Sequence, residues 1–317
     1  MDWHHTILER LKAARNTGGG WGYRSPSTPA AEPTALACLA LASNGAVGTG
    51  CESGLAWLAE LQNADGGVPI TVGMSAPCWP TALAVLAWMT ASAKGTFGSD
   101  VANRYRAIAQ RGANWLLAAC GKVFTSDPIV YGHDTRLAGW SWVDGTHSWV
   151  EPTAYAILAL RAAGPSDHPR VREGVTLLLD RALPDGGWNY GGKRVYMNTL
   201  RPFPGTSGIA LAALAGEPPL HGAPVDARIE AGITYLLNEL PRVRSPMSLA
   251  WGLIGLGAWN RRPAEAARWL AETAAQTLRA PANNVHDALL LLAGRERCPF
   301  ITSVTPSYGS SVSAIHG

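Results

Sequence analysis

The stretch EPTALACLAL at residues 32–41 sets the pattern for the whole chain. It returns as WPTALAVLAW at residues 79–88 and as EPTAYAILAL at residues 151–160. Weaker copies of the pattern begin at Gly205, Ser245 and Asn283. Proline fits the first turn of a helix, where its missing N–H would have no intrahelical partner. Because the copies are apolar nearly all round, we expect helices that are buried on every side.

A second kind of helix precedes each copy. Residues 225–240 carry a single apolar stripe on an otherwise polar segment, formed by Ile229, Ile233, Leu236, Leu237 and Leu240. Such a helix packs inward on one face and meets solvent on the other. Four of these segments share a glycine two or three places before a bulky pair, at Gly54, Gly112, Gly174 and Gly232.

This alternation predicts an all-α fold, a single (α/α)6 toroid of six outer and inner helix pairs. The predicted outer helices are residues 3–15, 51–63, 101–120, 168–183, 225–240 and 263–279. The predicted inner helices are residues 31–43, 79–91, 150–163, 205–215, 246–258 and 285–294. An open stack would need atypical repeats as polar caps, and the chain has none, so we expect a closed ring. The ring should span residues 1–296, and residues 297–317 form a tail that packs on it or extends from it.

Composition excludes several classes of protein. The 317 residues are 47% hydrophobic and 15% charged, which suits buried helices rather than disorder. A net charge of +3 with scattered Lys and Arg argues against nucleic-acid binding. The five cysteines form no Cys-x-x-Cys pair, so we expect reduced thiols and a cytoplasmic location. We expect no signal peptide and no membrane span, although peripheral membrane contact stays compatible with the sequence.

The lengths of the loops indicate which end of the ring carries the functional site. The connections from outer to inner helices are together much longer than those from inner to outer helices. In a ring of antiparallel hairpins they all lie at one end, and long loops on a rigid scaffold usually carry function. The same end gathers the inner-helix N-termini, whose dipoles favour an anionic occupant.

The repeats resemble the terpenoid cyclase and protein prenyltransferase superfamily. Residues 54–66 (GLAWLAELQNADG) are similar to the QW motif of squalene-hopene cyclases, with Val68 where Trp is usual. GGWG at residues 19–22, PST at 26–28 and TA at 34–35 are similar to segments of the same enzymes. The resemblance implies the toroid and an isoprenoid or similarly apolar ligand.

The chain departs from the family at its catalytic motifs. It lacks the Asp-x-Asp-Asp-Thr-Ala string of class II cyclases, and the nearest matches place Glu151 and Glu32 at the position of the protonating acid. His286 resembles a zinc ligand of prenyltransferases, but Ser245 and Met247 stand where the other two ligands belong. We therefore predict no metal and no cofactor. Class II cyclases build their site between two domains, so a second subunit or domain is a further expectation.

Glu151 is the predicted catalytic acid, supported by Asp144 and His147, with Asp134 as the alternative. For Glu32, the repeat counterpart of Glu151, a role at the helix N-terminus is the stronger interpretation. Predicted substrate contacts are Trp21, Tyr23, Trp79, His133, Arg136, Trp140, Trp142, Trp149, Trp188, Tyr190, Arg201 and His286. Aromatic walls suit a carbocation or polyprene. Alternatively, the indoles hold the loops together, the cations are solvated, and His286 is a hydrogen-bonded helix residue.

The leading hypothesis is acid-initiated cyclisation or isomerisation of a polyprene. Two alternatives fit the same residues: a non-catalytic toroid that binds an apolar ligand or a partner, and a carbohydrate-active toroid. A cyclase needs an acid that faces a dry cavity. A glycosidase needs two carboxylates about 5–10 Å apart across an open cleft. A binding module needs neither.

Overall fold

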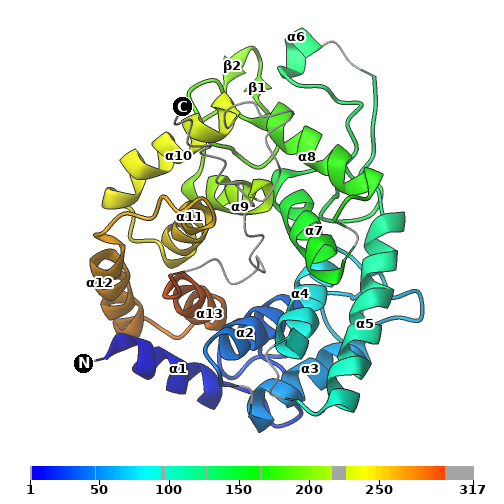
Figure 1. Ribbon diagram of the computed structural model, residues 1–317, viewed down its shortest axis with the longest axis vertical. Helices are drawn as coiled ribbons and strands as arrows, with labels where there is room; N and C mark the ends of the chain where they lie inside the picture. Colours follow the sequence, from blue (N-terminus) through cyan, green and yellow to red (C-terminus); the bar gives the residue numbers. More distant parts are fainter. Residues whose placement is uncertain are drawn as a thin grey trace, which may run out of the picture.

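A computed structural model describes residues 2–46, 48–93, 97–125, 128–164, 166–215 and 226–296. The predicted tail, residues 297–317, lies outside this part of the chain, as does Cys298. The described chain is a ring of helices inside a second ring of helices (Figure 1). No described helix is long and apolar enough to cross a membrane.

All twelve predicted helices are confirmed to within a few residues. The outer ring consists of α1 (Trp3–Ala13), α3 (Thr49–Leu61), α5 (Ser99–Ala118), α8 (Pro169–Arg181), α10 (Ala227–Glu239) and α12 (Ala266–Arg279). The inner ring consists of α2 (Ala31–Ser43), α4 (Pro80–Ala93), α7 (Val150–Ala163), α9 (Pro204–Leu214), α11 (Pro246–Ala258) and α13 (Asn284–Ala293). The sequence did not predict α6 (Pro128–Tyr131), the hairpin of β1 (Arg194–Val195) and β2 (Asn198–Thr199), or η2 (Leu240–Arg242). These short elements lie in the long loops, where no periodic pattern marks them.

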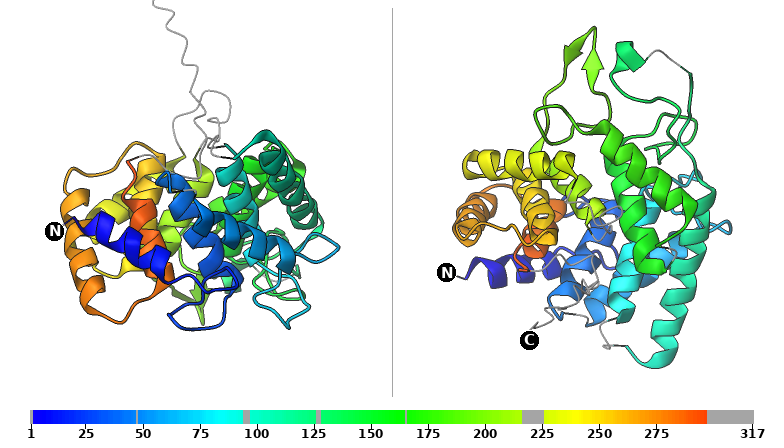
Figure 2. Two further views of the ribbon diagram at one scale, coloured as in Figure 1. Left: turned by 90° about the horizontal axis from the view of Figure 1, so that it is seen from below. Right: turned by 45° about the horizontal axis from the view of Figure 1, so that its top comes forward.

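The predicted closed ring is also confirmed. Each inner helix contacts the next in the order α2, α4, α7, α9, α11 and α13, and α13 returns to α2. Helix α1 packs against α12 and α13, so the first and last helix pairs of the ring are in contact (Figures 1 and 2). An (α/α)6 toroid therefore describes the fold.

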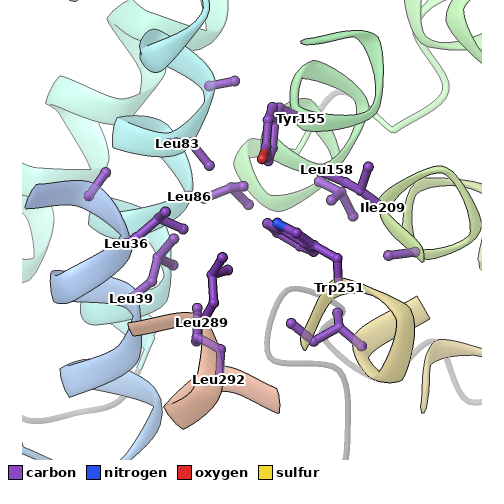
Figure 3. Packing of buried hydrophobic residues seen from close by; sticks show 14 of the residues in the cluster. Leu36, Leu39, Leu83, Leu86, Tyr155, Leu158, Ile209, Trp251, Leu289 and Leu292 are labelled. Carbon is purple, nitrogen blue, oxygen red and sulfur yellow. The ribbon is translucent and has the colours of Figure 1, made fainter. Parts of the chain in front are cut away.

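Apolar side chains from all six inner helices line the interior of the ring. Figure 3 shows ten of them converging on the axis: Leu36, Leu39, Leu83, Leu86, Tyr155, Leu158, Ile209, Trp251, Leu289 and Leu292. All of them are buried. This explains why the inner helices read as apolar on every side: their other faces pack on the outer ring.

A buried hydroxyl at the start of the inner helices holds the preceding loop. The Thr34 Oγ1 atom accepts a hydrogen bond from the Trp21 backbone N–H at 2.9 Å and donates to the Trp21 carbonyl at 3.1 Å. Thr153 binds the backbone of Trp140 in the same way, and Ser207 binds that of Trp188. Since one side chain satisfies a donor and an acceptor, the loop can be buried without unpaired backbone groups.

The tryptophans of these loops lock each repeat to its neighbours. The indole N–H of Trp21 donates to the Leu11 carbonyl of the outer helix before it, at 2.7 Å. Its ring then covers Gly54 of the next outer helix, where an added Cβ atom would lie 2.6 Å from the ring. Trp140 covers Gly174 and Trp188 covers Gly232 in the same manner. At Gly54, Gly174 and Gly232, the recurring glycine is therefore a seat for the indole of the preceding repeat, whereas an added Cβ atom at Gly112 would meet Val85.

An ion pair joins the first helix of the ring to the last one. Arg10 of α1 binds both carboxylate oxygens of Asp287 on α13, through Nε at 2.8 Å and Nη2 at 2.5 Å. Its Nη1 atom also donates to the Thr277 carbonyl of α12. The Asp287 side chain is fully buried, and burial raises its pKa while Arg10 opposes the rise. One guanidinium thus joins the three helices that close the ring.

Replacing Gly54, which the Trp21 ring covers, tests the packing between repeats. We expect Gly54→Ala to lower the free energy of unfolding by about 1–3 kcal/mol, because the new methyl group overlaps Trp21 and the Cys38 sulfur. Gly50→Ala on the same helix meets no close atom and should be neutral or slightly stabilising. Urea unfolding followed by circular dichroism compares the two; equal losses would contradict the seat.

Variants of Arg10 and Asp287 test whether their ion pair stabilises the closed ring. Arg10→Ala should cost about 3–5 kcal/mol, because it leaves the Asp287 carboxylate buried without a partner. The double variant Arg10→Leu with Asp287→Leu should cost less than the single variant, since no charge is then stranded. Denaturant unfolding measures both, and a double variant that loses at least as much as Arg10→Ala would argue against a sealing role.

Candidate active site

The long-loop end of the ring brings three equivalent residues together. Glu32, Trp79 and Glu151 each stand immediately before the proline that begins the repeated Pro-Thr-Ala element. Glu32 belongs to α2 and Glu151 to α7, and α4, which Trp79 precedes, contacts both of these helices. Trp79 therefore lies between the two carboxyl groups in the order of the ring.

Each carboxyl group is held by a hydroxyl from another segment. The Tyr23 phenol donates to Glu32 Oε2 at 2.5 Å, and the Thr206 hydroxyl of α9 donates to Glu151 Oε1 at 2.8 Å. Both glutamates are partly buried. Such bonds fix the two side chains in place before any ligand arrives.

Burial changes the protonation of both glutamates. It raises the pKa of Glu32, and the charge of Glu151 raises it further, against the opposing hydrogen bond from Tyr23. Burial also raises the pKa of Glu151, opposed by the bond from Thr206. The carboxyl groups are therefore close enough to interact, and ionisation of Glu151 favours the protonated form of Glu32.

A chain of aromatic rings runs from the loop end into the ring. Trp142 meets Trp79 edge-on at 4.9 Å, and Trp79 stacks on Tyr155 at 6.0 Å. Tyr155 then meets Trp251 of α11 at 5.7 Å, and both project toward the axis in Figure 3. Burial and the charges of Glu151 and Glu32 raise the pKa of Tyr155, which keeps its phenol neutral. The carboxyl pair thus lies beside an aromatic path that leads to the apolar interior.

The remaining predicted acid–base residues lie apart from this pair. Asp134 is paired with Arg136, which lowers the pKa of Asp134 to about 2, so this carboxylate stays ionised and is unsuited to donate a proton. His147 is exposed and packs its ring on Phe124. Asp144 is exposed and lines a separate cavity that Trp79 also lines. The structure shows no contact of Asp144 or His147 with Glu151 among the described residues.

The predicted binding residues divide into several groups. Trp21 and Trp188 are fully buried in the wall of the ring, where they serve packing. Trp140 is almost as buried but lines the same cavity as Asp144. The site around Glu32 and Glu151 includes Tyr23, Trp79 and Trp142, as described above. Trp149 is the residue before α7 and is partly buried.

Other predicted contacts lie at the periphery of the long-loop end. Tyr190 is exposed and its ring meets Phe203 at 5.0 Å, and Arg201 is also exposed. Burial and the nearby Arg181 lower the pKa of His133 to about 4. His286 lies in the first turn of α13, where burial lowers its pKa. Within the described residues, no three His, Cys, Asp or Glu side chains gather to hold a metal ion.

Four residues of the site were not predicted in this role. Glu32 repeats the Glu-Pro-Thr element of Glu151, and that repetition was the available signal. Tyr155 occupies the position that Leu36 has in the first copy of the repeat. Its aromatic side chain at that position was the available signal. Thr206 and Trp251 carry no pattern that relates them to residues far away in sequence.

Comparison with known proteins supports the fold and leaves the activity open. A wild-type glycosidase superposes with a TM-score of 0.57 at 14% identity, covering 94% of this chain and 98% of its own. The type II terpene cyclase MstE from Scytonema gives 0.53 at 16% identity, covering 87% of this chain and 78% of its own. A protein from Actinoplanes gives 0.54 at 17% identity, covering 89% and 82%. No protein-family model and no curated protein sequence matches the chain.

The raised pKa of Glu32 predicts a pH-dependent stability. A carboxyl group with a higher pKa in the folded chain binds its proton more tightly there, so stability falls as pH rises through the ordinary Glu range. Glu32→Gln should therefore raise the melting temperature at pH 7, and the gain should shrink as pH falls toward 4. Thermal unfolding across this range measures the effect. The exposed Glu60, changed to Gln, is the control and should show no such trend.

Proposed function

We propose that the protein cleaves a glycosidic bond, with Glu32 as general acid and Glu151 as the ionised partner. The observation that carries the proposal is the pair of interacting carboxyl groups on either side of Trp79. Glycoside hydrolysis needs two carboxyl groups in unlike protonation states across one bond. In this proposal, a protonated Glu32 and an ionised Glu151 would meet this requirement.

The roles follow from the two environments. We assign the proton to Glu32, because burial and the charge of Glu151 both raise the pKa of Glu32, whereas burial alone raises that of Glu151. It donates that proton to the glycosidic oxygen as the bond to the anomeric carbon breaks. Glu151 either takes a proton from the attacking water or itself attacks the anomeric carbon, and the separation of the carboxyl groups around bound sugar decides between these routes.

Trp79 supplies a platform between the two acids. One face of a pyranose presents C–H groups, and these pack on an indole ring while the hydroxyls at the ring edge reach polar neighbours. Trp142 holds the Trp79 ring edge-on and so limits its rotation. The similar glycosidase supports the proposal, because 98% of its chain aligns with this single ring.

The aromatic path into the ring favours a second candidate, acid-initiated chemistry on an isoprenoid. Trp79, Tyr155 and Trp251 form a series of π faces that would stabilise a carbocation. In that case Glu151, with its raised pKa, would supply the initiating proton. This candidate needs one acid and leaves the second carboxyl group without a task.

Paired substrates with good and poor leaving groups test the proposed roles. The wild type should hydrolyse at least one member of a panel of 4-nitrophenyl glycosides and unmodified oligosaccharides. Glu32→Gln should lose about 10²–10⁴-fold in kcat on the oligosaccharide. It should retain much of its activity on the 4-nitrophenyl glycoside, because nitrophenolate departs with little help from an acid. Glu151→Gln should lose activity on both, and Glu60→Gln on neither.

Squalene and geranylgeranyl diphosphate provide the competing test. Turnover of either one that is abolished by Glu151→Gln, with no glycoside cleaved by the wild type, would establish the isoprenoid candidate instead. If neither class reacts and an apolar ligand copurifies with the protein, the ring is a binding module. Product analysis by gas chromatography and mass spectrometry distinguishes these results.

A further inference from the structure

A cavity of about 620 Å³ opens beside the carboxyl pair, between the second and third repeats of the ring. Its base is formed by the buried side chains of Ala82, Leu116 and Trp140. Trp79 and Trp115 supply aromatic walls. The volume lies inside the range of about 300–1,000 Å³ that is usual for small-molecule sites.

Polar groups stand around the mouth of this cavity. Asp65, Asn114 and Asp144 line it from three different segments, and all three are exposed. Asp65 accepts the Gly67 N–H through Oδ1 at 2.9 Å, and its other carboxylate oxygen has no hydrogen-bond partner among the described residues. Asn114 accepts a bond from Gln110 at its Oδ1, which leaves its NH₂ group available. Asp144 forms no hydrogen bond with the described part of the chain.

The cavity and the carboxyl pair share a wall. Trp79 lines the cavity and also lies between Glu32 and Glu151 in the ring, and Pro152, the residue after Glu151, lines the cavity too. A ligand that reaches across Trp79 would therefore touch the cavity and the reacting groups at once. The cavity shares Trp79 with the site, and neither Glu32 nor Glu151 lines it.

We infer that this cavity is a subsite that binds the hydroxyl-rich part of a carbohydrate beyond the bond that is cleaved. The inference rests on the proposed function and names where that substrate extends. Carboxylates and amides at the mouth suit hydroxyl groups, each of which donates one hydrogen bond and accepts others. Indole walls suit the C–H faces of the same sugar rings. An isoprenoid chain offers no hydrogen-bond donor to Asp65 or Asp144, which disfavours it here.

Binding to a catalytically impaired chain separates the subsite from the reaction. Glu151→Gln is titrated with cello-, xylo- and malto-oligosaccharides of one to five units, and affinity is followed by calorimetry and by indole fluorescence. Affinity for one series should rise as units are added to fill the cavity. Adding Asp65→Ala and Asp144→Ala together should weaken binding of the longer members at least tenfold and leave the monosaccharide unchanged.

A matched control isolates the turn from the cavity. Asp185 precedes a Gly-Gly pair as Asp65 does, but it lies in another repeat and does not line the cavity. Asp185→Ala should therefore leave oligosaccharide affinity at its original value. In an active chain, the Asp65 and Asp144 double variant should raise KM for the longer oligosaccharide at least tenfold more than it raises KM for a 4-nitrophenyl monosaccharide.

The two inferences fail in different ways. Hydrolysis that depends on Glu32 and Glu151, with no effect of the double variant at any chain length, overturns the subsite and keeps the proposed function. Oligosaccharide binding that the double variant weakens, with no hydrolysis by the wild type, keeps the subsite and overturns the proposed function. Failure of all three oligosaccharide series to bind at 10-fold molar excess over millimolar protein overturns the carbohydrate subsite itself.

Discussion

In the first, third and fourth repeats, a single buried hydroxyl in the first turn of the inner helix holds the loop before it, and the packing between repeats builds on that contact. Thr34, Thr153 and Ser207 each pair with both backbone groups of one tryptophan. The tryptophan in turn binds the outer helix behind it and covers a glycine of the next. Each of these three tryptophans therefore links its own repeat to the outer helix of the next one.

The same contact places the candidate site. Glu32 and Glu151 stand two residues before the hydroxyls of Thr34 and Thr153, and Trp79 stands two residues before Thr81. The hydroxyl fixes the start of each of these helices. The residues two places before it therefore lie at equivalent positions at the long-loop end of the ring. The ring then needs no special loop to bring two acids and an indole together. Differences between repeats at this one position place two carboxyl groups and an indole at the candidate site.

Two opposing effects act on the ionisation of the carboxyl groups in the site. Burial favours neutral carboxyl groups at Glu32 and Glu151, whereas the hydroxyls of Tyr23 and Thr206 favour charged ones. The N-terminal dipoles of α2 and α7 add to the second effect. The balance leaves two acids in one place with raised pKa values, a condition that costs stability at neutral pH and suits acid–base catalysis.

The sequence alone determined the twelve main helices, their division into inner and outer rings, and the end at which the long loops gather. The apolar periodicity and the repeated Pro-Thr element provide this information locally. The spacing of apolar residues along a helix shows whether one face or every face is buried. Only the tertiary structure decided that the charge of Glu151 acts on Glu32, that Trp21 and Trp188 are buried in the wall of the ring, and that Asp144 lines a neighbouring cavity. Those relations depend on the curvature of the closed ring, which brings together side chains more than a hundred residues apart, and no local spacing encodes that distance.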